Sequence, residues 1–174
     1  MIWSLALVLT FCAACIDGRT QRIPNWLTVS GLTAGVLAHG VLSGLSGVLT
    51  AIEGAGLGLA IVLPLVWLRA LGAGDGKLMA ALGAVVGPQM LCFVLFASVL
   101  VAGLMAAILT VRAGRVRETF HNIGLILMGF LTFGFKAHPE ISLDNPDALK
   151  LPFGVAAAVG TLICFVAAHW HLGI

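Results

Sequence analysis

Long apolar runs constrain this chain more than any other feature of its sequence. They cover residues 1–16, 26–47, 48–68, 78–111, 120–135 and 151–172. A helix needs about 20 apolar residues to cross a bilayer. The chain lacks the alternating pattern of a membrane β-barrel, so its membrane-spanning segments must be helices. The run 78–111 is long enough for two short crossings, because Gly87-Pro88 breaks it. We therefore predict an all-α, polytopic integral membrane protein.

Composition supports this class. Of 174 residues, 60% are hydrophobic and 9% are charged, whereas about a quarter of the residues are charged in ordinary soluble domains. We expect one transmembrane domain over residues 1–174, in contact with membrane lipid. The net charge of +2 is small and its Lys and Arg residues are dispersed, which argues against a nucleic-acid partner.

The nine Lys and Arg residues predict the orientation. If Met1 lies outside, successive crossings bring one group to the cytoplasmic side: Arg19, Arg22, Arg69, Lys77, Arg112, Arg115 and Arg117. The run 120–135 is only marginally long enough to span, and if it lies in the interface, Lys136 and Lys150 are cytoplasmic too. We therefore prefer six transmembrane helices and one interfacial helix over seven spans.

Glycine is abundant, with 22 residues. Gly54, Gly56 and Gly58 lie on one apolar run and predict close helix packing there, because small residues let transmembrane helices approach.

Two acids deserve a chemical interpretation because of where the topology puts them. Asp17 ends the first predicted span and Asp75 begins the fourth, so the crossings between them return both to one membrane face. Two carboxylates held close together share a proton, so that one acts as a base and the other as an acid. Such a pair can activate water for attack on a peptide carbonyl and protonate the leaving amine, without a cofactor.

Each acid also has a purely structural interpretation. Asp75 precedes a helix that could start at Gly76, where it would be an N-cap. Asp17-Gly18 could be a turn that ends the first helix.

The residues around the acids favour the catalytic interpretation. The stretches DGRTQRIPNWLT (17–28) and ALGAGDGKLMAALGAVVG (70–87) resemble the prepilin peptidase family, the GxGD-type intramembrane aspartyl proteases. A third stretch, LPFGVAAAVG (151–160), is similar to the Pro-aromatic-Gly segment that opens the last span in that family. The matching motif positions are Asp17, Ile23, Pro24 and Asn25 in the first stretch, and Gly72, Gly74, Asp75 and Lys77 in the second.

The resemblance implies an activity. Asp17 and Asp75 would be the catalytic pair of a protease in the bacterial inner membrane. The pair would cut near the cytoplasmic face, between the polar leader and the hydrophobic N-terminal helix of a pilin-like precursor. Gly72 and Gly74 would let the backbone bend and approach this substrate.

The other motif residues keep two interpretations each. Lys77 would hold an acid or a lipid headgroup, or would only extend its ammonium to the interface. Asn25 would form a hydrogen bond near Asp17, or Pro24-Asn25 would simply start the second span.

The chain is similar to the short, peptidase-only members that serve tight-adherence (Flp) pili. Larger members carry paired CxxC motifs before the first Asp, whereas sixteen residues precede Asp17 here, so we expect no methyltransferase segment. Cys12 and Cys15 form one CxxC, but a tetrahedral zinc site needs two more ligands, so we predict no metal.

A function of another class stays open. Acids at membrane depth also act as proton relays in transporters or coupling subunits. Relay acids usually lie near midspan and transporters often have two similar halves, whereas Asp17 and Asp75 lie at span ends and no internal repeat is evident. A noncatalytic scaffold would tolerate the loss of either acid.

Overall fold

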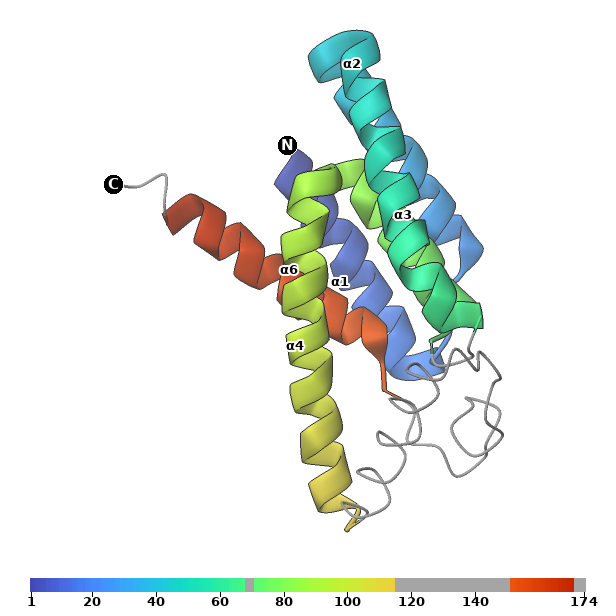
Figure 1. Cartoon of the computed structure of the whole chain (residues 1–174), viewed down its shortest axis with the longest axis vertical. Helices are drawn as coiled ribbons and strands as arrows, with labels where there is room; N and C mark the ends of the chain where they lie inside the picture. The colour runs from blue at the N-terminus through green and yellow to red at the C-terminus, as the bar shows by residue number, and fades with distance from the viewer. Residues whose placement is uncertain (68–70, 115–150, 171–174) are drawn as a thin grey trace, which may run out of the picture.

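The computed structural model describes residues 1–67, 71–114 and 151–170. Within these ranges the chain forms five α-helices and no strand (Figure 1): α1 (Ile2–Thr20), α2 (Asn25–Trp67), α3 (Ala73–Val86), α4 (Pro88–Arg112) and α6 (Phe153–Trp170). Among these described helices, all but α3 are long and apolar enough to cross a membrane. The all-helical membrane fold is confirmed. The count of about six spans stays a prediction, and the segment 120–135 lies outside the described residues.

Helix α2 is a helical hairpin that reverses direction at Gly44. Gly44 has φ 61° and ψ −141°, a backbone conformation that glycine adopts far more readily than other residues. A methyl group on Gly47 would overlap the carbonyl of His39, whereas residues eight apart in a straight helix are about 12 Å apart. The two halves, 25–43 and 45–67, therefore run side by side (Figure 1). The break lies a few residues before the predicted boundary between runs 26–47 and 48–68.

Helix α3 lies in the core, between the two halves of α2. All of its residues from Leu78 to Val86 are buried. Gly35 of the first half of α2 faces the backbone of α3 at Ala84, and Gly58 of the second half faces it at Met79. With 14 residues α3 is about 21 Å long, so it is shorter than the bilayer core of about 30 Å. Protein rather than lipid surrounds most of this helix.

The junction between α3 and α4 is the break predicted at Gly87-Pro88. Helix α3 ends at Val86, Gly87 has φ 80°, and Pro88 is the first residue of α4. Proline suits the first position of a helix because its missing N–H would have no partner there. The chain thus turns from α3 directly into α4, and this prediction is confirmed.

The predicted glycine packing is right for two of three residues. Gly54 and Gly58 contact the backbone of α3, at Gly83 and Met79. Gly56 packs closely against none of the described residues, so within this part of the chain the prediction was wrong for this residue. Residues two apart lie on different sides of a helix, whereas residues four apart share a side, which is the physical reason for the difference.

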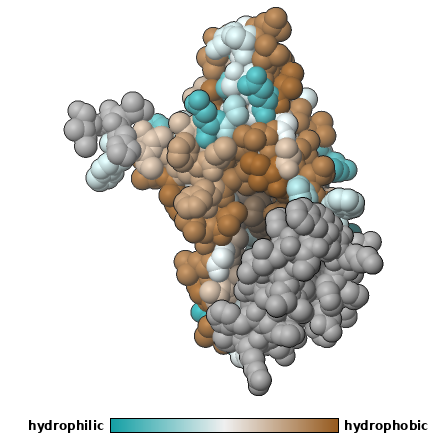
Figure 2. Space-filling model, viewed as in Figure 1, coloured by the Kyte–Doolittle hydropathy of each residue, from teal (hydrophilic) through white to brown (hydrophobic). Residues whose placement is uncertain are grey.

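The remaining helices complete a bundle with an apolar exterior. Helix α6 packs against both α1 and α4. Gly160 of α6 lies against the backbone of Ser98 in α4, and Leu9 of α1 fills the space beside Gly31 of α2. Large apolar side chains such as Phe11, Phe93 and Phe96 are exposed, and Figure 2 shows apolar residues over most of the described surface in that view. Apolar surface of this extent is typical of contact with lipid.

The glycine contacts of α2 lead to a prediction about stability. In Gly54→Ala the new methyl group would overlap the carbonyl of Gly83, so the helices must separate. We expect Gly54→Ala to lower the free energy of unfolding by roughly 1–3 kcal/mol. Gly56→Ala is the matched control, because no atom of residues 1–67, 71–114 or 151–170 outside its own helix turn lies within 4 Å of its new methyl group. Thermal melting of both variants in detergent checks this, and equal melting temperatures would contradict the packing described.

Candidate active site

Asp17 lies in the last turn of α1 and is only 4% exposed. Its Oδ2 accepts the backbone N–H of Gly154, the second residue of α6, at 2.8 Å. The first N–H groups of a helix have no partner within the helix and carry partial positive charge, so they stabilise a carboxylate. Asp17 thus joins the end of α1 to the start of α6.

The turn interpretation of Asp17-Gly18 was wrong. Helix α1 continues through both residues to Thr20 and ends at Gln21, which has φ 51° in the left-handed region. The N–H of Gln21 bonds the carbonyl of Asp17 at 2.8 Å, which closes the last turn.

Asp75 is the third residue of α3 and is half-buried. Its Oδ2 accepts the backbone N–H of Gly72, the N-cap residue, at 3.1 Å. This is the acidic half of a capping box. The helix starts at Ala73, before Asp75, so the prediction of Asp75 as the N-cap of a helix from Gly76 was wrong in position, although the side chain does take part in capping.

The pKa of Asp75 is affected by the neighbouring acid, Asp17. Asp75 lies outside the four helices that could span a membrane. Burial is the largest cause that raises its pKa, the negative charge of Asp17 is the second, and together they raise the pKa to about 6. The hydrogen bond from Gly72 acts in the opposite direction. A carboxyl group with this pKa can bind and release a proton near neutral pH.

Asp17 and Asp75 line the same cavity, of about 770 Å³. Its walls come from the end of α1, the residues around Gly72, the second half of α2, one face of α4 and the start of α6. In Figure 1, α1 ends and α3 and α6 begin at the same end of the bundle. Both acids thus lie at one end of the structure, as the predicted crossings required.

The two motif glycines have a different role from the one predicted. Gly72 has φ −71° and ψ 145°, which any residue adopts, and Gly74 has no positive φ either, so the expected glycine-specific bend is wrong. Instead, a methyl group on Gly72 would lie 3.0 Å from Oδ2 of Asp75, and one on Gly74 would lie 3.3 Å from Cβ of Ile23. The glycines therefore leave room for the side chains of Asp75 and Ile23, and their approach to substrate stays a prediction.

Lys77 and Asn25 form a pair. The Nζ of Lys77 donates a hydrogen bond to Oδ1 of Asn25 at 2.8 Å, at an exposed position. Helix α2 begins at Asn25, and the carbonyl of Pro24 accepts the N–H of Leu27 at 3.2 Å, as expected for a helix start. The pair links the starts of α2 and α3. The predicted partners of Lys77, an acid or a lipid headgroup, stay untested.

Sequence reasoning missed Gly154. The stretch 151–160 was identified as a motif, but nothing in it indicated contact with a residue 137 positions away. A methyl group on Gly154 would lie 3.0 Å from Cβ of Asp17 and 3.2 Å from the carbonyl oxygen of Ala13. The signal available in the sequence was the glycine itself, which follows Pro152 and Phe153 near the start of the last apolar run.

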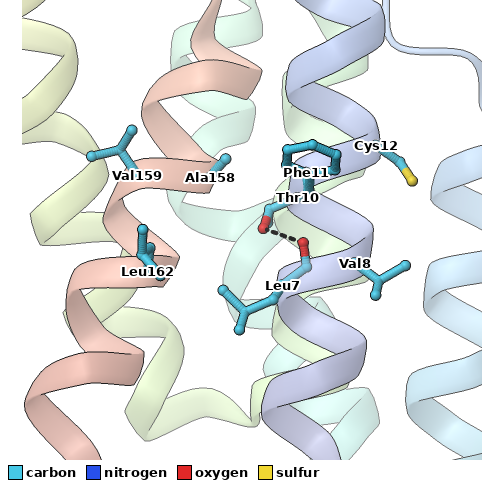
Figure 3. A pocket seen from close by; sticks show the side chains of 8 residues that line it. All are labelled: Leu7, Val8, Thr10, Phe11, Cys12, Ala158, Val159 and Leu162. Atoms are coloured by element: carbon cyan, nitrogen blue, oxygen red, sulfur yellow. Dashed lines mark hydrogen bonds between the residues drawn. The ribbon is translucent and has the colours of Figure 1, made fainter.

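A second pocket lies away from the acids. It has a volume of about 460 Å³ and lies between α1 and α6 (Figure 3). Its lining is almost entirely apolar and includes Phe11, Cys12 and Leu162. The hydroxyl of Thr10 faces the backbone of its own helix, where it bonds the carbonyl of Leu7 at 3.3 Å. Among the described residues, no three His, Cys, Asp or Glu side chains gather as a metal site would require.

Comparison with known proteins agrees with the geometry. A sequence model of the type IV leader peptidase family matches residues 4–108, which include both acids. The chain belongs to the type IV leader peptidase family. The resemblance stated from the motifs is confirmed, and membership implies a peptidase, aspartic in this family, with a pilin-like precursor as substrate. No curated protein and no solved structure matches the chain significantly.

The raised pKa of Asp75 predicts a pH-dependent stability. The folded protein binds a proton at Asp75 more tightly than the unfolded chain, so this contribution to stability is present below about pH 4 and is lost as the pH rises through about 6. Asp75→Asn removes the charge but keeps an oxygen for Gly72. We expect this variant to melt above the unchanged protein at about pH 8 and level with it at about pH 4. A difference independent of pH would contradict the burial of a charged Asp75.

The contact of Gly154 with Asp17 predicts an effect on activity. Gly154→Ala should push the start of α6 away from Asp17 and lower peptidase activity by about 10- to 100-fold, because catalysis is sensitive to small displacements. Gly18→Ala is the control, since its methyl group would meet only Val155, at 4.0 Å. Cleavage rates of a pilin-like precursor check this. Equal rates for the two variants would show that α6 does not position Asp17.

Proposed function

We propose that this protein is a membrane-embedded aspartyl endopeptidase that removes the leader peptide from type IV pilin-like precursors of the Flp type. The observation that most directly supports this proposal is that Asp17 and Asp75 line one cavity, where the charge of Asp17 raises the pKa of Asp75. The Flp assignment rests on the resemblance of the sequence to the short members of the family.

The two carboxyl groups would divide the chemistry between them. An ionised carboxylate takes a proton from a water molecule held between the acids as the water attacks the scissile carbonyl, and the protonated partner donates to the substrate. A pKa of about 6 lets Asp75 take and release a proton near neutral pH, as a group that alternates between acid and base must. No covalent nucleophile takes part in this route.

The backbone contacts would keep the carboxyl groups in place during the reaction. In each acid Oδ2 is held by a backbone N–H, from Gly154 for Asp17 and from Gly72 for Asp75. Both donors lie at helix starts, where N–H groups are available. A substrate helix must unwind near the scissile bond, because its carbonyls are otherwise occupied by its own hydrogen bonds.

We place the active site at the cytoplasmic face of the bacterial inner membrane. Positively charged residues cluster at the end of the bundle that carries the acids: Arg19 and Arg22 follow Asp17, and Lys77 follows Asp75. Helix α4 ends at the same side of Figure 1, with Arg112 as its last residue. An excess of Lys and Arg is typical of the cytoplasmic side.

Asparagine substitutions test the catalytic pair. The intact protein, Asp17→Asn and Asp75→Asn are each co-expressed with pilin-like precursors encoded near this chain, and leader removal is followed by gel shift. Asparagine keeps the size and the acceptor oxygen but cannot share a proton, so we expect a loss of cleavage of about a thousandfold or more in each variant.

Two outcomes would contradict the proposal. Cleavage by either variant at the normal rate excludes a two-carboxylate mechanism. If the intact protein cleaves no precursor offered, the proton-relay alternative gains support, and proton flux through vesicles containing the protein becomes the measurement that decides it.

A further inference from the structure

The cavity that holds the acids extends along an apolar face of α4. The residues of α4 that line it are Leu95, Val99, Ala102, Gly103 and Ala106. Their spacing of three and four places them on one side of the helix, over a length of about 16 Å. The second half of α2 supplies the opposite apolar wall, with Ile61, Val62 and Leu65. We call this part of the cavity the α2–α4 groove.

Three residues of the α4 wall are small: Ala102, Gly103 and Ala106. Gly103 is exposed, and none of the residues that the structure describes lies within 4 Å of the position where its Cβ would stand. Ala102 and Ala106 are spaced four apart on the same face, the pattern that lets two helices in a membrane approach closely. The wall therefore has space for another helix backbone.

The lining of the cavity combines polar and apolar groups. Asp17, Gln21, Arg22 and Asp75 supply the polar side chains, whereas the described residues that form the α2–α4 groove are all apolar. A bound peptide with its scissile bond at Asp17 and Asp75 would thus meet both polar groups and the apolar walls of the groove. A polar segment joined to an apolar helix matches this arrangement.

We propose that the α2–α4 groove seats the apolar helix adjoining the scissile bond, and that the small residues of α4 limit how bulky this helix can be. This inference rests on the proposed function, because it takes the occupant to be the precursor. The groove continues directly into the catalytic cavity, which favours a substrate segment over a lipid chain. Gly103 is then a specificity-determining residue.

Two leucine substitutions test the groove. Among the described residues, nothing lies within 4 Å of a Cβ built on Gly103 or on Gly56, but only Gly103 lines the cavity. Gly103→Leu therefore projects a side chain into the groove, and Gly56→Leu is its matched control. Cleavage is measured in membranes that contain the full protein. The substrate is the pilin-like precursor whose gene lies nearest to the gene of this protein. We expect Gly103→Leu to slow leader removal by about tenfold or more, Gly103→Ala to have an intermediate effect, and Gly56→Leu to have none.

Photocrosslinking provides a second measurement. A benzoylphenylalanine placed at position 103 or 56, in the uncleaving Asp75→Asn protein, should crosslink to the apolar helix of the precursor from position 103 only. Replacing the large residue of the precursor found in that crosslink by alanine should restore cleavage by Gly103→Leu.

The outcomes separate the two proposals. Normal cleavage by Gly103→Leu, or crosslinks from position 103 to lipid alone, overturns the groove while leaving the catalytic pair intact. A melting temperature lowered by Gly103→Leu but not by Gly56→Leu means that part of this chain itself packs on the groove, which also overturns the inference. Failure of the unchanged protein to cleave the precursor overturns the proposed function and the groove with it.

Discussion

The structure depends on the burial of α3 between the two halves of α2. Helix α3 carries Asp75 in its first turn and is too short to cross a bilayer unaided. Its backbone can lie inside the helical bundle because glycines of α2, such as Gly54 and Gly58, bring protein into direct contact with it. Moving α2 away from α3 by the width of a methyl group would also move the residues of α2 that line the cavity beside Asp75.

The sequence was sufficient to predict this arrangement where simple periodic rules apply. The apolar runs predicted an all-helical membrane fold, and Gly87-Pro88 predicted the junction of α3 and α4. The predicted crossings between Asp17 and Asp75 return the chain to the same membrane face, and this was enough to predict that both acids lie at one end of the bundle. The sequence could not reveal that α2 reverses at Gly44 rather than later, because no charged residue and no proline marks the turn within the long apolar stretch.

The contacts that position the site were harder to predict. The bond from Gly154 to Asp17 joins residues far apart in sequence, and no local pattern specifies which helix start meets which acid. Gly72 and Gly74 were expected to let the backbone bend and approach a substrate, and in the structure they leave space beside Asp75 and Ile23. A glycine in a motif indicates that a side chain is excluded, and only the structure shows whether conformation or packing excludes it.

Helix ends solve a conflict that an aspartyl protease in a membrane must face. The reaction needs charged carboxylates and water, both of which are costly next to hydrocarbon. At midspan every backbone N–H is used within its helix, so a carboxylate there would require side-chain partners. At the starts of α3 and α6, N–H groups are available to Asp75 and Asp17, and no further polar side chain is needed to hold either acid.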